Sequence, residues 1–277
     1  MKTFKLTKNI LKKFVPYQVG VKLRGGWQKV MGYYFKGSNY YCPYCKQWFR
    51  KFLPGGQHHA VIVQYQIIGS GYRENAVCPR CYSTDRDRLL FAYLNGIGFF
   101  ESKLKLLHIA PEGSLRAYIQ QRTKIEYITG DKQTDGYNDY YYERGITNLD
   151  LVQLPFEDES FDAIICNHVL EHIIDDHKAM SELFRVLKKN AWAILQVPFS
   201  PYLSETYENE NIIQPKDREQ HFGQFDHVRI YGHDYLERLK AVGFKVSLTH
   251  LSVEKYPEIS TFAINPQEPI FVAEKIS

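Results

Sequence analysis

Acidic residues are missing from the first part of the chain. Residues 1–73 carry 13 of the 35 lysines and arginines but no aspartate or glutamate, and the first acid is Glu74. The rest of the chain holds 22 basic residues against all 31 acidic ones, a net charge of −9. A basic region of this kind can bind nucleic acid, an anionic membrane surface or a phosphorylated substrate, or it can pair with the acidic part of its own chain. The charges leave both interpretations open.

Long hydrophobic runs are also missing. No apolar run approaches the roughly 20 residues that cross a bilayer. Lysines interrupt the apolar residues of the N-terminus every few positions, which is not the pattern of a secretory signal. We therefore expect a soluble, cytoplasmic protein with no transmembrane segment. Its 277 residues, 44% of them hydrophobic, are enough for one large domain with a real core and one small domain.

Cysteine is scarce, with five residues in the chain, and four of them form two matched motifs. "CPYC" contains Cys42 and Cys45, and "CPRC" contains Cys78 and Cys81. Two residues between thiolates let one tight turn present both sulfurs to the same ion, and two such turns complete a tetrahedral site that suits zinc. Two disulfides or a redox pair are the alternative, which a cytoplasmic location disfavours. The fifth, Cys166, lies in an apolar run and is expected in the core.

The composition divides the chain into three parts. Residues 1–36 form a basic N-terminal segment, whose apolar spacing predicts a short amphipathic helix. Residues 37–84 form a zinc-ribbon-like module that is irregular except for a strand-like run from Ala60 to Ile68. A structural zinc ion with four thiolate ligands would hold this module together and leave no open position for catalysis. Asp85 is expected to cap a helix at the start of the third part, residues 85–277.

Strand patterns alternate with helical patterns after residue 100. Such alternation predicts an α/β fold, in which a parallel sheet is built through right-handed crossovers. The last two strand candidates are joined by a proline-containing loop without a helical pattern, which favours an antiparallel final pair. The strand candidates are 104–109, 125–129, 161–166, 191–197, 244–250 and 269–274, and the helical patterns are 114–122, 176–188 and 233–242.

Small and polar residues follow the predicted strands, at the edge where parallel sheets bind ligands. The first strand is followed by Ala110-Pro111-Glu112-Gly113, in the position of a nucleotide-binding turn. Asp131 follows the second strand, about 20 residues past the first loop, where an acid can accept hydrogen bonds from ribose hydroxyls. Further along the chain, Asp150 ends a short extended run, Leu151 comes next, and Asn167 and His168 follow the strand "FDAIIC".

The run "DLVQLPFEDESFDAIICNHVLEHIID" resembles the class I S-adenosylmethionine-dependent methyltransferases, specifically the small-molecule-type subgroup with an LPF…SFD…LEH pattern. The resemblance covers roughly residues 100–277. It implies a Rossmann-like, doubly wound sheet of seven strands with the last strand antiparallel, and S-adenosyl-L-methionine as the cofactor. The chain is also similar to a variant family of methyltransferases that carries "LHIAPE" in the first loop and a CPxC…CPxC module ahead of it.

The resemblance also implies roles for single residues. Asp131 would bind the ribose of the cofactor, and Asp150 and Leu151 would border its adenine. Asn167 and His168 would line the cofactor and face the substrate. The first loop, from His108 through Gly113, would lie along the methionine part, with His108, Ala110, Pro111, Glu112 and Gly113 as cofactor-binding residues.

The first loop departs from the D-x-G-x-G-x-G pattern of the family. Glycine allows the backbone to approach a ligand closely, and this chain has the small Ala110 in its place. Glu112 could pair with the ammonium group of the cofactor, which has no phosphate and needs no phosphate cradle. We interpret the loop as a rewritten cofactor loop; an ordinary strand-to-helix connection is the alternative.

The polar stretch "REQHFGQFDHVRIYGHDY", residues 218–235, is the best source of a general base. Methyl transfer needs positioning and sometimes a base that takes the acceptor's proton. The alternative is a polar loop whose histidines bond backbone groups. Arg218 and Arg229 could hold a carboxylate or phosphate of the acceptor.

His172 is expected to be structural. The catalytic candidates are His227, His221, His168, Tyr231 and Arg229.

Three functions remain open from the sequence. The first is a methyltransferase that acts on a small or carrier-bound molecule. The second is an RNA methyltransferase that grips RNA through its basic zinc module. The third is a non-enzymatic zinc-ribbon binding protein whose sheet domain is degenerate. The second function would use the aromatic residues of the acid-free region, Trp27, Tyr33, Tyr34, Tyr40, Tyr41, Tyr44 and Trp48.

Overall fold

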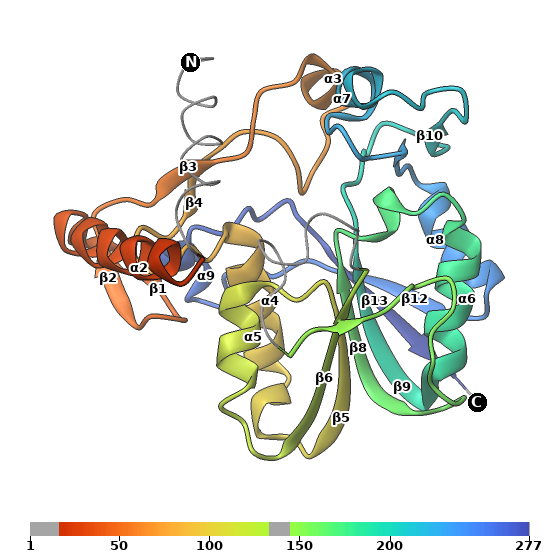
Figure 1. Ribbon diagram of the computed structural model, residues 1–277, viewed down its shortest axis with the longest axis horizontal. Helices are drawn as coiled ribbons and strands as arrows, with labels where there is room; N and C mark the ends of the chain where they lie inside the picture. Colours follow the sequence, from red (N-terminus) through yellow and green to blue (C-terminus); the bar gives the residue numbers. More distant parts are fainter. Residues whose placement is uncertain (1–16, 133–144, 277) are drawn as a thin grey trace.

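The computed structural model describes residues 17–132 and 145–276. In this part of the chain the largest sheet has seven strands in the order β12-β13-β9-β8-β5-β6-β7 (Figure 1). This is the α/β, Rossmann-like doubly wound sheet that the sequence predicts. Its strands are β5 (Leu104–Ile109), β6 (Ile125–Asp131), β7 (Thr147–Asn148), β8 (Phe161–Asn167), β9 (Leu187–Gln196), β12 (Lys245–Thr249) and β13 (Ile270–Lys275).

The direction of the strands also agrees with the prediction. β5 pairs in parallel with β6 and β8, β6 with β7, and β8 with β9. β13 pairs antiparallel with both of its neighbours, β9 and β12. The predicted antiparallel final strand is therefore confirmed. The carboxyl ends of β5, β6 and β8 consequently lie at one edge, where the candidate ligand loops begin.

The sheet has a hydrophobic core on each face, because successive side chains of a strand point to opposite sides. Leu107, Ile164 and Cys166 belong to one core, and Leu106 and Ile165 belong to the other. Cys166 is fully buried, as expected. The first core is covered by α6 (Asp176–Val186) and α8 (Asp234–Ala241), and the second by α4 (Asp85–Gly96), α5 (Gly113–Ile119) and α9 (Ile259–Phe262) (Figure 1).

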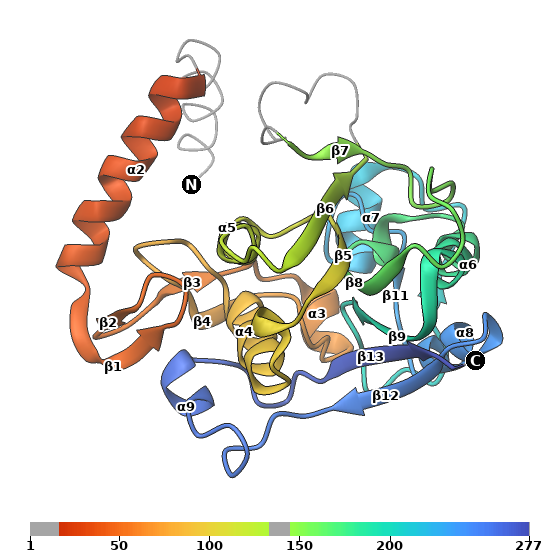
Figure 2. The same ribbon diagram turned by 90° about the horizontal axis from the view of Figure 1, so that it is seen from below.

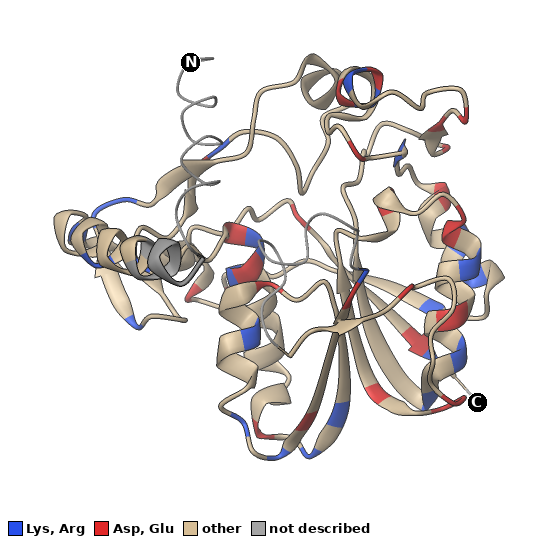
Figure 3. Ribbon diagram, in the orientation of Figure 1, with Lys and Arg blue, Asp and Glu red and all other residues tan. Residues whose placement is uncertain are grey.

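The N-terminal part forms a smaller module with its own core. Phe35, Phe49 and Phe52 are buried together with Cys42 and Cys78. Helix α2 projects from one end of the module, away from the large sheet (Figure 2). No acid occurs between Tyr17 and Glu74, so the ribbon of this part carries basic residues without acidic ones (Figure 3). The elements are α2 (Tyr17–Tyr34), β1 (Lys36–Cys42), β2 (Gln47–Phe49), β3 (Leu53–Gly55) and β4 (Arg73–Val77).

One buried arginine ties the module to the sheet domain. Arg88, on α4, has no exposed surface. Its guanidinium donates hydrogen bonds to the backbone carbonyls of Ser83 and Ala76 in the module, at 2.8 and 3.0 Å. It also donates to the carbonyl of Phe262 on α9, and it lies 4.3 Å from the ring centre of Phe52. Burial lowers the pKa of Arg88, but the surrounding carbonyls satisfy the cation.

The structure corrects three local predictions. The strand-like run Ala60–Ile68 is instead a short helix, α3 (Ala60–Gln64), followed by a turn. Its Val61 and Ile62 pack with Phe222, so tertiary packing overrides the β-branched composition. Thr84, not Asp85, caps α4, through a capping box with Asp87.

The third correction concerns the end of the helical pattern 176–188. Helix α6 ends at Val186, and Leu187 already begins β9, so the lysine-rich segment belongs to the strand. The remaining elements are η1 (Phe99–Glu101), η2 (Leu170–His172), β10 (Tyr207–Glu208), α7 (Pro215–Phe222) and β11 (Arg229–Ile230). Among the described residues, no helix is long and apolar enough to cross a membrane.

Candidate functional site

The four module cysteines converge on one point. The sulfur of Cys42 lies 3.5 Å from that of Cys81, and the sulfur of Cys45 lies 3.8 Å from that of Cys78. These separations are far longer than the roughly 2 Å of a disulfide bond. They match the roughly 3.8 Å between the sulfurs of a tetrahedral site with zinc–sulfur bonds of about 2.3 Å. The backbone NH of Arg80 also points at the sulfur of Cys78, at 3.4 Å. The donor set therefore fits zinc.

The first loop rests on a buried polar network. The carboxylate of Glu112 lies 2.9 Å from Nε2 of His108 and accepts a hydrogen bond of 2.8 Å from the amide of Asn167. The other ring nitrogen of His108 lies 2.9 Å from the hydroxyl of Tyr127. Burial acts to raise the pKa of Glu112, but the contact with His108 outweighs it and lowers this pKa. Glu112 is therefore an ionised carboxylate whose position is fixed by His108 and Asn167.

The network corrects part of the predicted binding set. His108 is fully buried and both of its ring nitrogens are engaged, so it positions Glu112 and has no surface to offer a ligand. Asn167 is likewise 6% exposed and bonded to Glu112. Ala110 has a φ of 46°, in the left-handed region that glycine favours. The loop thus adopts a glycine-like backbone at the position where the family pattern has glycine.

A cavity of about 710 Å³ opens at the carboxyl edge of the sheet, and we call it the strand-end cavity. It brings together separate parts of the sequence, represented by Ala110, Asp131, the adjacent Asp150 and Leu151, and His168. Pro111, Glu112 and Gly113 lie outside its lining. Burial raises the pKa of Asp131. Asp150 accepts a hydrogen bond of 2.7 Å from Lys132, which lowers its pKa.

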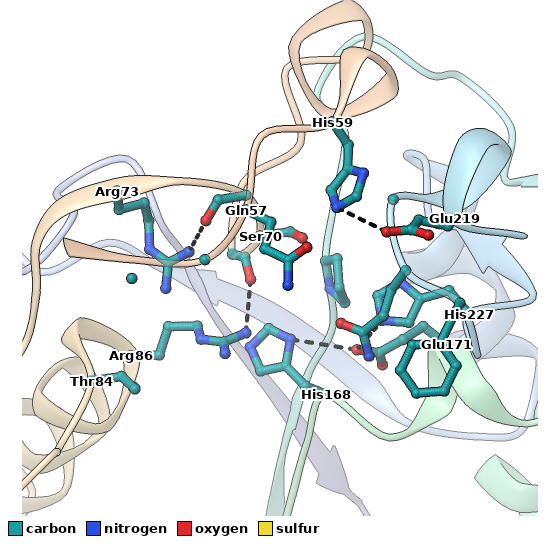
Figure 4. Close-up of a pocket in the computed structure, with 18 of the residues that line it drawn as sticks. Gln57, His59, Ser70, Arg73, Thr84, Arg86, His168, Glu171, Glu219 and His227 are labelled. Atoms are coloured by element: carbon teal, nitrogen blue, oxygen red, sulfur yellow. Dashed lines mark hydrogen bonds and ion pairs between the residues drawn. The ribbon is translucent and has the colours of Figure 1, made fainter. Parts of the chain in front are cut away.

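A second cavity, of about 700 Å³, lies between the module and the sheet, and we call it the module-facing cavity. One wall comes from the segment Gly55–Arg73, and the opposite wall comes from Arg86, His168 and His227 (Figure 4). Nη1 of Arg86 donates to the carbonyl of Gly69, at 2.8 Å. His168 and His172 line both cavities, so the two spaces adjoin at these residues.

Three histidines surround a buried carboxylate at this junction. Nδ1 of His168 lies 3.5 Å from Oε1 of Glu171, and Nε2 of His227 lies 4.0 Å from the same oxygen (Figure 4). Burial lowers the pKa of His168, and it lowers the pKa of His227 to about 4. Burial acts to raise the pKa of Glu171, but the histidines reverse the shift and keep it ionised at neutral pH. His168 has a φ of 54°, another left-handed backbone at this junction.

The other catalytic candidates lie outside both cavities. Tyr231 has no exposed surface, and its hydroxyl donates to Asp176 at 2.8 Å. Arg229 is buried and donates to the carbonyls of Leu170 and Ile174, at 3.2 and 2.9 Å. These two residues brace the LEH segment instead of facing a ligand. His221 is exposed on α7 and is bonded to the hydroxyl of Tyr207, at 2.7 Å.

Sequence reasoning missed Glu171 and the wall Gly55–Arg73, and it considered His172 structural. The signal for Glu171 was a single acid inside the apolar run "VLEHII". Such an acid is expensive to bury without a partner, which makes it a candidate functional group. The wall had no signal, because its glycines line the cavity with backbone, and only the fold brings that backbone to the sheet.

The fold and the loops at its carboxyl edge define an α/β protein with a Rossmann-like, doubly wound sheet. Residues 116–195 match the family model described as "Methyltransferase domain". A 64-residue segment is 38% identical to the "Uncharacterized methyltransferase YcgJ" of Bacillus subtilis (strain 168), covering 21% of this chain and 25% of that protein. The chain thus spans about a quarter of the length of this curated relative.

Solved structures with a similar fold include two methyltransferases. One is an S-adenosylmethionine-dependent methyltransferase from Archaeoglobus fulgidus, 16% identical, with a TM-score of 0.44 over 70% of this chain and 96% of that one. The other is the 1,6-didemethyltoxoflavin-N1-methyltransferase of Burkholderia thailandensis, 15% identical, with a TM-score of 0.44 over 69% of this chain and 82% of that one. The matched family model and the curated relative both concern methyltransferases.

Proposed function

We propose that the protein transfers a methyl group from S-adenosyl-L-methionine, bound in the strand-end cavity, to a small or carrier-bound acceptor in the module-facing cavity. One observation carries the proposal. The cavity at the carboxyl edge of the sheet gathers Ala110, Asp131, Asp150 and Leu151, and it joins a second cavity at His168. Two adjoining spaces of this kind suit a donor and an acceptor that react across the junction.

The chain's own residues fit the cofactor by their chemistry. Asp131 ends β6 and offers a carboxylate to ribose hydroxyls. Asp150 offers an acceptor to the adenine amine beside the apolar Leu151. The backbone at Ala110 lacks a bulky side chain and can lie close to a ligand. S-adenosylmethionine supplies a methyl group activated by a sulfonium, so the C–S bond breaks as the bond to the acceptor atom forms.

The acceptor would lie against the side chains of the module-facing cavity. Arg86, His168 and His227 give this space hydrogen-bond donors and acceptors on its sheet side. Nδ1 of His168 is buried 3.5 Å from the carboxylate of Glu171, and the ring borders both cavities. With Nδ1 enclosed, Nε2 of the neutral imidazole is the nitrogen that would take the proton that the acceptor loses. Gly55–Arg73 would close the space from the module side and exclude water.

We further propose that Cys42, Cys45, Cys78 and Cys81 bind a structural zinc ion. The ion would hold the two strand pairs of the module, and through them the wall of the acceptor cavity. No thiolate would be left for catalysis in a site with four protein ligands.

The first test is a calorimetric titration of the zinc-loaded protein with S-adenosylhomocysteine. We expect micromolar binding that Asp131→Ala weakens 10- to 100-fold, since hydrogen bonds to a charged group contribute about 1.5–3 kcal/mol. Asp158→Ala, which removes an exposed carboxylate that pairs with Arg185 and lines neither cavity, serves as the matched control. If the folded wild-type protein does not bind S-adenosylhomocysteine, the result would contradict the enzyme hypothesis and favour a non-enzymatic zinc-ribbon protein.

A basic hollow on the module favours RNA as a second candidate acceptor. A cavity of about 480 Å³ is lined by Lys29, Lys36, Lys46, Trp48 and Arg80 among other residues. Cations beside an exposed indole ring suit phosphates and stacked bases. In a gel-shift assay, RNA binding that weakens steeply with salt and is lost in Trp48→Ala would favour this acceptor over a small molecule.

A further inference from the structure

We propose that Glu171, His172 and His227 form a second metal site, for a divalent transition ion of the Zn²⁺ type, on the floor of the module-facing cavity. The site is separate from the cysteine cluster. It does not depend on methyl transfer, because it follows from the placement of these three side chains. Its donor set, two imidazoles and one carboxylate, is one that zinc enzymes use.

The burial of Glu171 is the first observation. The residue is 1% exposed, and neither carboxylate oxygen has a hydrogen-bond partner among the described residues. A buried ionised carboxylate without hydrogen bonds is among the most costly arrangements in a protein. Two imidazole nitrogens approach it at longer than usual hydrogen-bond distances, His168 Nδ1 at 3.5 Å and His227 Nε2 at 4.0 Å. A divalent cation between the carboxylate and the rings would supply the missing positive charge.

The geometry of the donors is the second observation. One donor atom from each of Glu171, His172 and His227 lies within 4.8 Å of the other two. In a tetrahedral site with bonds of about 2.0–2.1 Å, the donors lie roughly 3.3–3.4 Å apart. Side-chain rotations that move each donor by about an ångström would therefore close the site around an ion. The rings of His172 and His227 already stand edge to face, with centroids 4.7 Å apart.

Backbone hydrogen bonds hold His227 beside Glu171 and His172, although more than 50 positions separate it from them. The NH of Val228 donates to the carbonyl of Glu171, at 2.9 Å, which fixes His227 beside the LEH turn. Arg229 donates to the carbonyls of Leu170 and Ile174, on both sides of that turn. Arg229 is thus a positioning residue for this cluster.

A supporting carboxylate is the third observation. Asp226 lies 3.4 Å from Nδ1 of His172. An acid on one ring nitrogen orients the imidazole and leaves the other nitrogen, Nε2, as the donor for a metal. Carboxylate–histidine–metal arrangements are frequent in metal sites because they fix the ring and its tautomer.

The three residues of the proposed metal site face a cavity, so a bound ion could contact a ligand there. Glu171, His172 and His227 all line the module-facing cavity. With three protein ligands, the fourth position of a tetrahedral ion would face that space. It could take water or an oxygen or nitrogen atom of a molecule bound there, and lower the pKa of a hydroxyl so that it becomes a better nucleophile.

The test is a metal count on untagged, full-length protein equilibrated with Zn²⁺ and dialysed. We expect two equivalents of zinc in the wild type and one in Glu171→Gln and His227→Ala. His221→Ala removes an exposed histidine six residues from His227 and should keep two equivalents. One equivalent in the wild type would overturn the proposal, and so would two equivalents in both cluster variants.

Cobalt substitution separates the second site from the first. Cobalt on the cysteines gives thiolate charge-transfer bands, which nitrogen and oxygen ligands do not give. We expect Glu171→Gln to keep these bands, which also shows that the module is folded, and to lose the weaker visible bands of the second ion. A wild-type spectrum with the thiolate bands alone at saturating cobalt would contradict the second site.

Discussion

Ala110 carries the conformational cost of the first loop. A residue with a Cβ atom in the left-handed region is strained by roughly 1–2 kcal/mol, and Ala110 has a φ of 46°. Glycine would relieve the strain but lose more chain entropy on folding, about 0.5–1 kcal/mol. We therefore expect Ala110→Gly to raise the free energy of unfolding by up to about 1 kcal/mol.

Denaturant unfolding measures this change. Ala117→Gly, at an exposed position inside helix α5, is the matched control and should lower the free energy of unfolding by about 1 kcal/mol. Equal destabilisation by both variants would show that Ala110 is not strained in solution.

At the residue scale, the sequence predicts which acids reach the cavity better than it predicts which other polar side chains are buried. Asp131 and Asp150 lie in the strand-end cavity, where the post-strand loops lead one to expect them. His108 and Tyr231 were wrongly expected to face a ligand, because a sequence does not show which side of a loop or strand a polar side chain takes. Both are buried in hydrogen-bonded networks.

Helix α4 connects the two parts of the molecule through a single side chain. The guanidinium of Arg88 satisfies carbonyls of the module and of α9 at once. Methionine has a similar length and no hydrogen-bond donor, so Arg88→Met would leave several buried carbonyls unpaired, at about 1–3 kcal/mol each. We expect a loss of more than about 3 kcal/mol in the free energy of unfolding, or separate unfolding of the module.

Thermal unfolding followed by tryptophan fluorescence distinguishes the two outcomes. Overall destabilisation gives one transition at lower temperature, and separate unfolding of the module gives two. Lys36→Met, at an exposed position of the same module, should change the free energy of unfolding by less than about 0.5 kcal/mol. A fully stable Arg88→Met variant with one cooperative transition would show that this arginine does not join the parts.

At the element scale, the periodic elements could be predicted and the short ones could not. The strands β5, β6, β8, β12 and β13 fall within a residue or two of their expected ranges. For β8 and β13 the reason is that buried strands read as nearly continuous apolar runs. The segment Ala60–Gln64 has the same apolar, β-branched character but is a helix. It packs against α7, whose residues lie more than 150 positions later in the chain, and no local pattern reports such a contact.

The whole molecule has two bodies that share one cavity. The acid-free residues 1–73 supply the wall Gly55–Arg73, and the sheet domain supplies the histidines and Arg86. The opposite charges of the two parts suggested either an external partner or contact within the chain. The contact of Arg88 with Phe52 and the shared cavity show that the two parts pack together. The basic hollow is lined by other residues of the module than the shared cavity.

The most direct test is a crystal structure of the zinc-loaded protein grown with S-adenosylhomocysteine. We predict ligand density in the strand-end cavity, with the ribose on Asp131, the adenine beside Asp150 and Leu151, and the sulfur directed at the junction near His168. Ligand bound elsewhere, or an empty strand-end cavity in crystals grown at saturating ligand, would contradict a methyl donor site at this edge of the sheet.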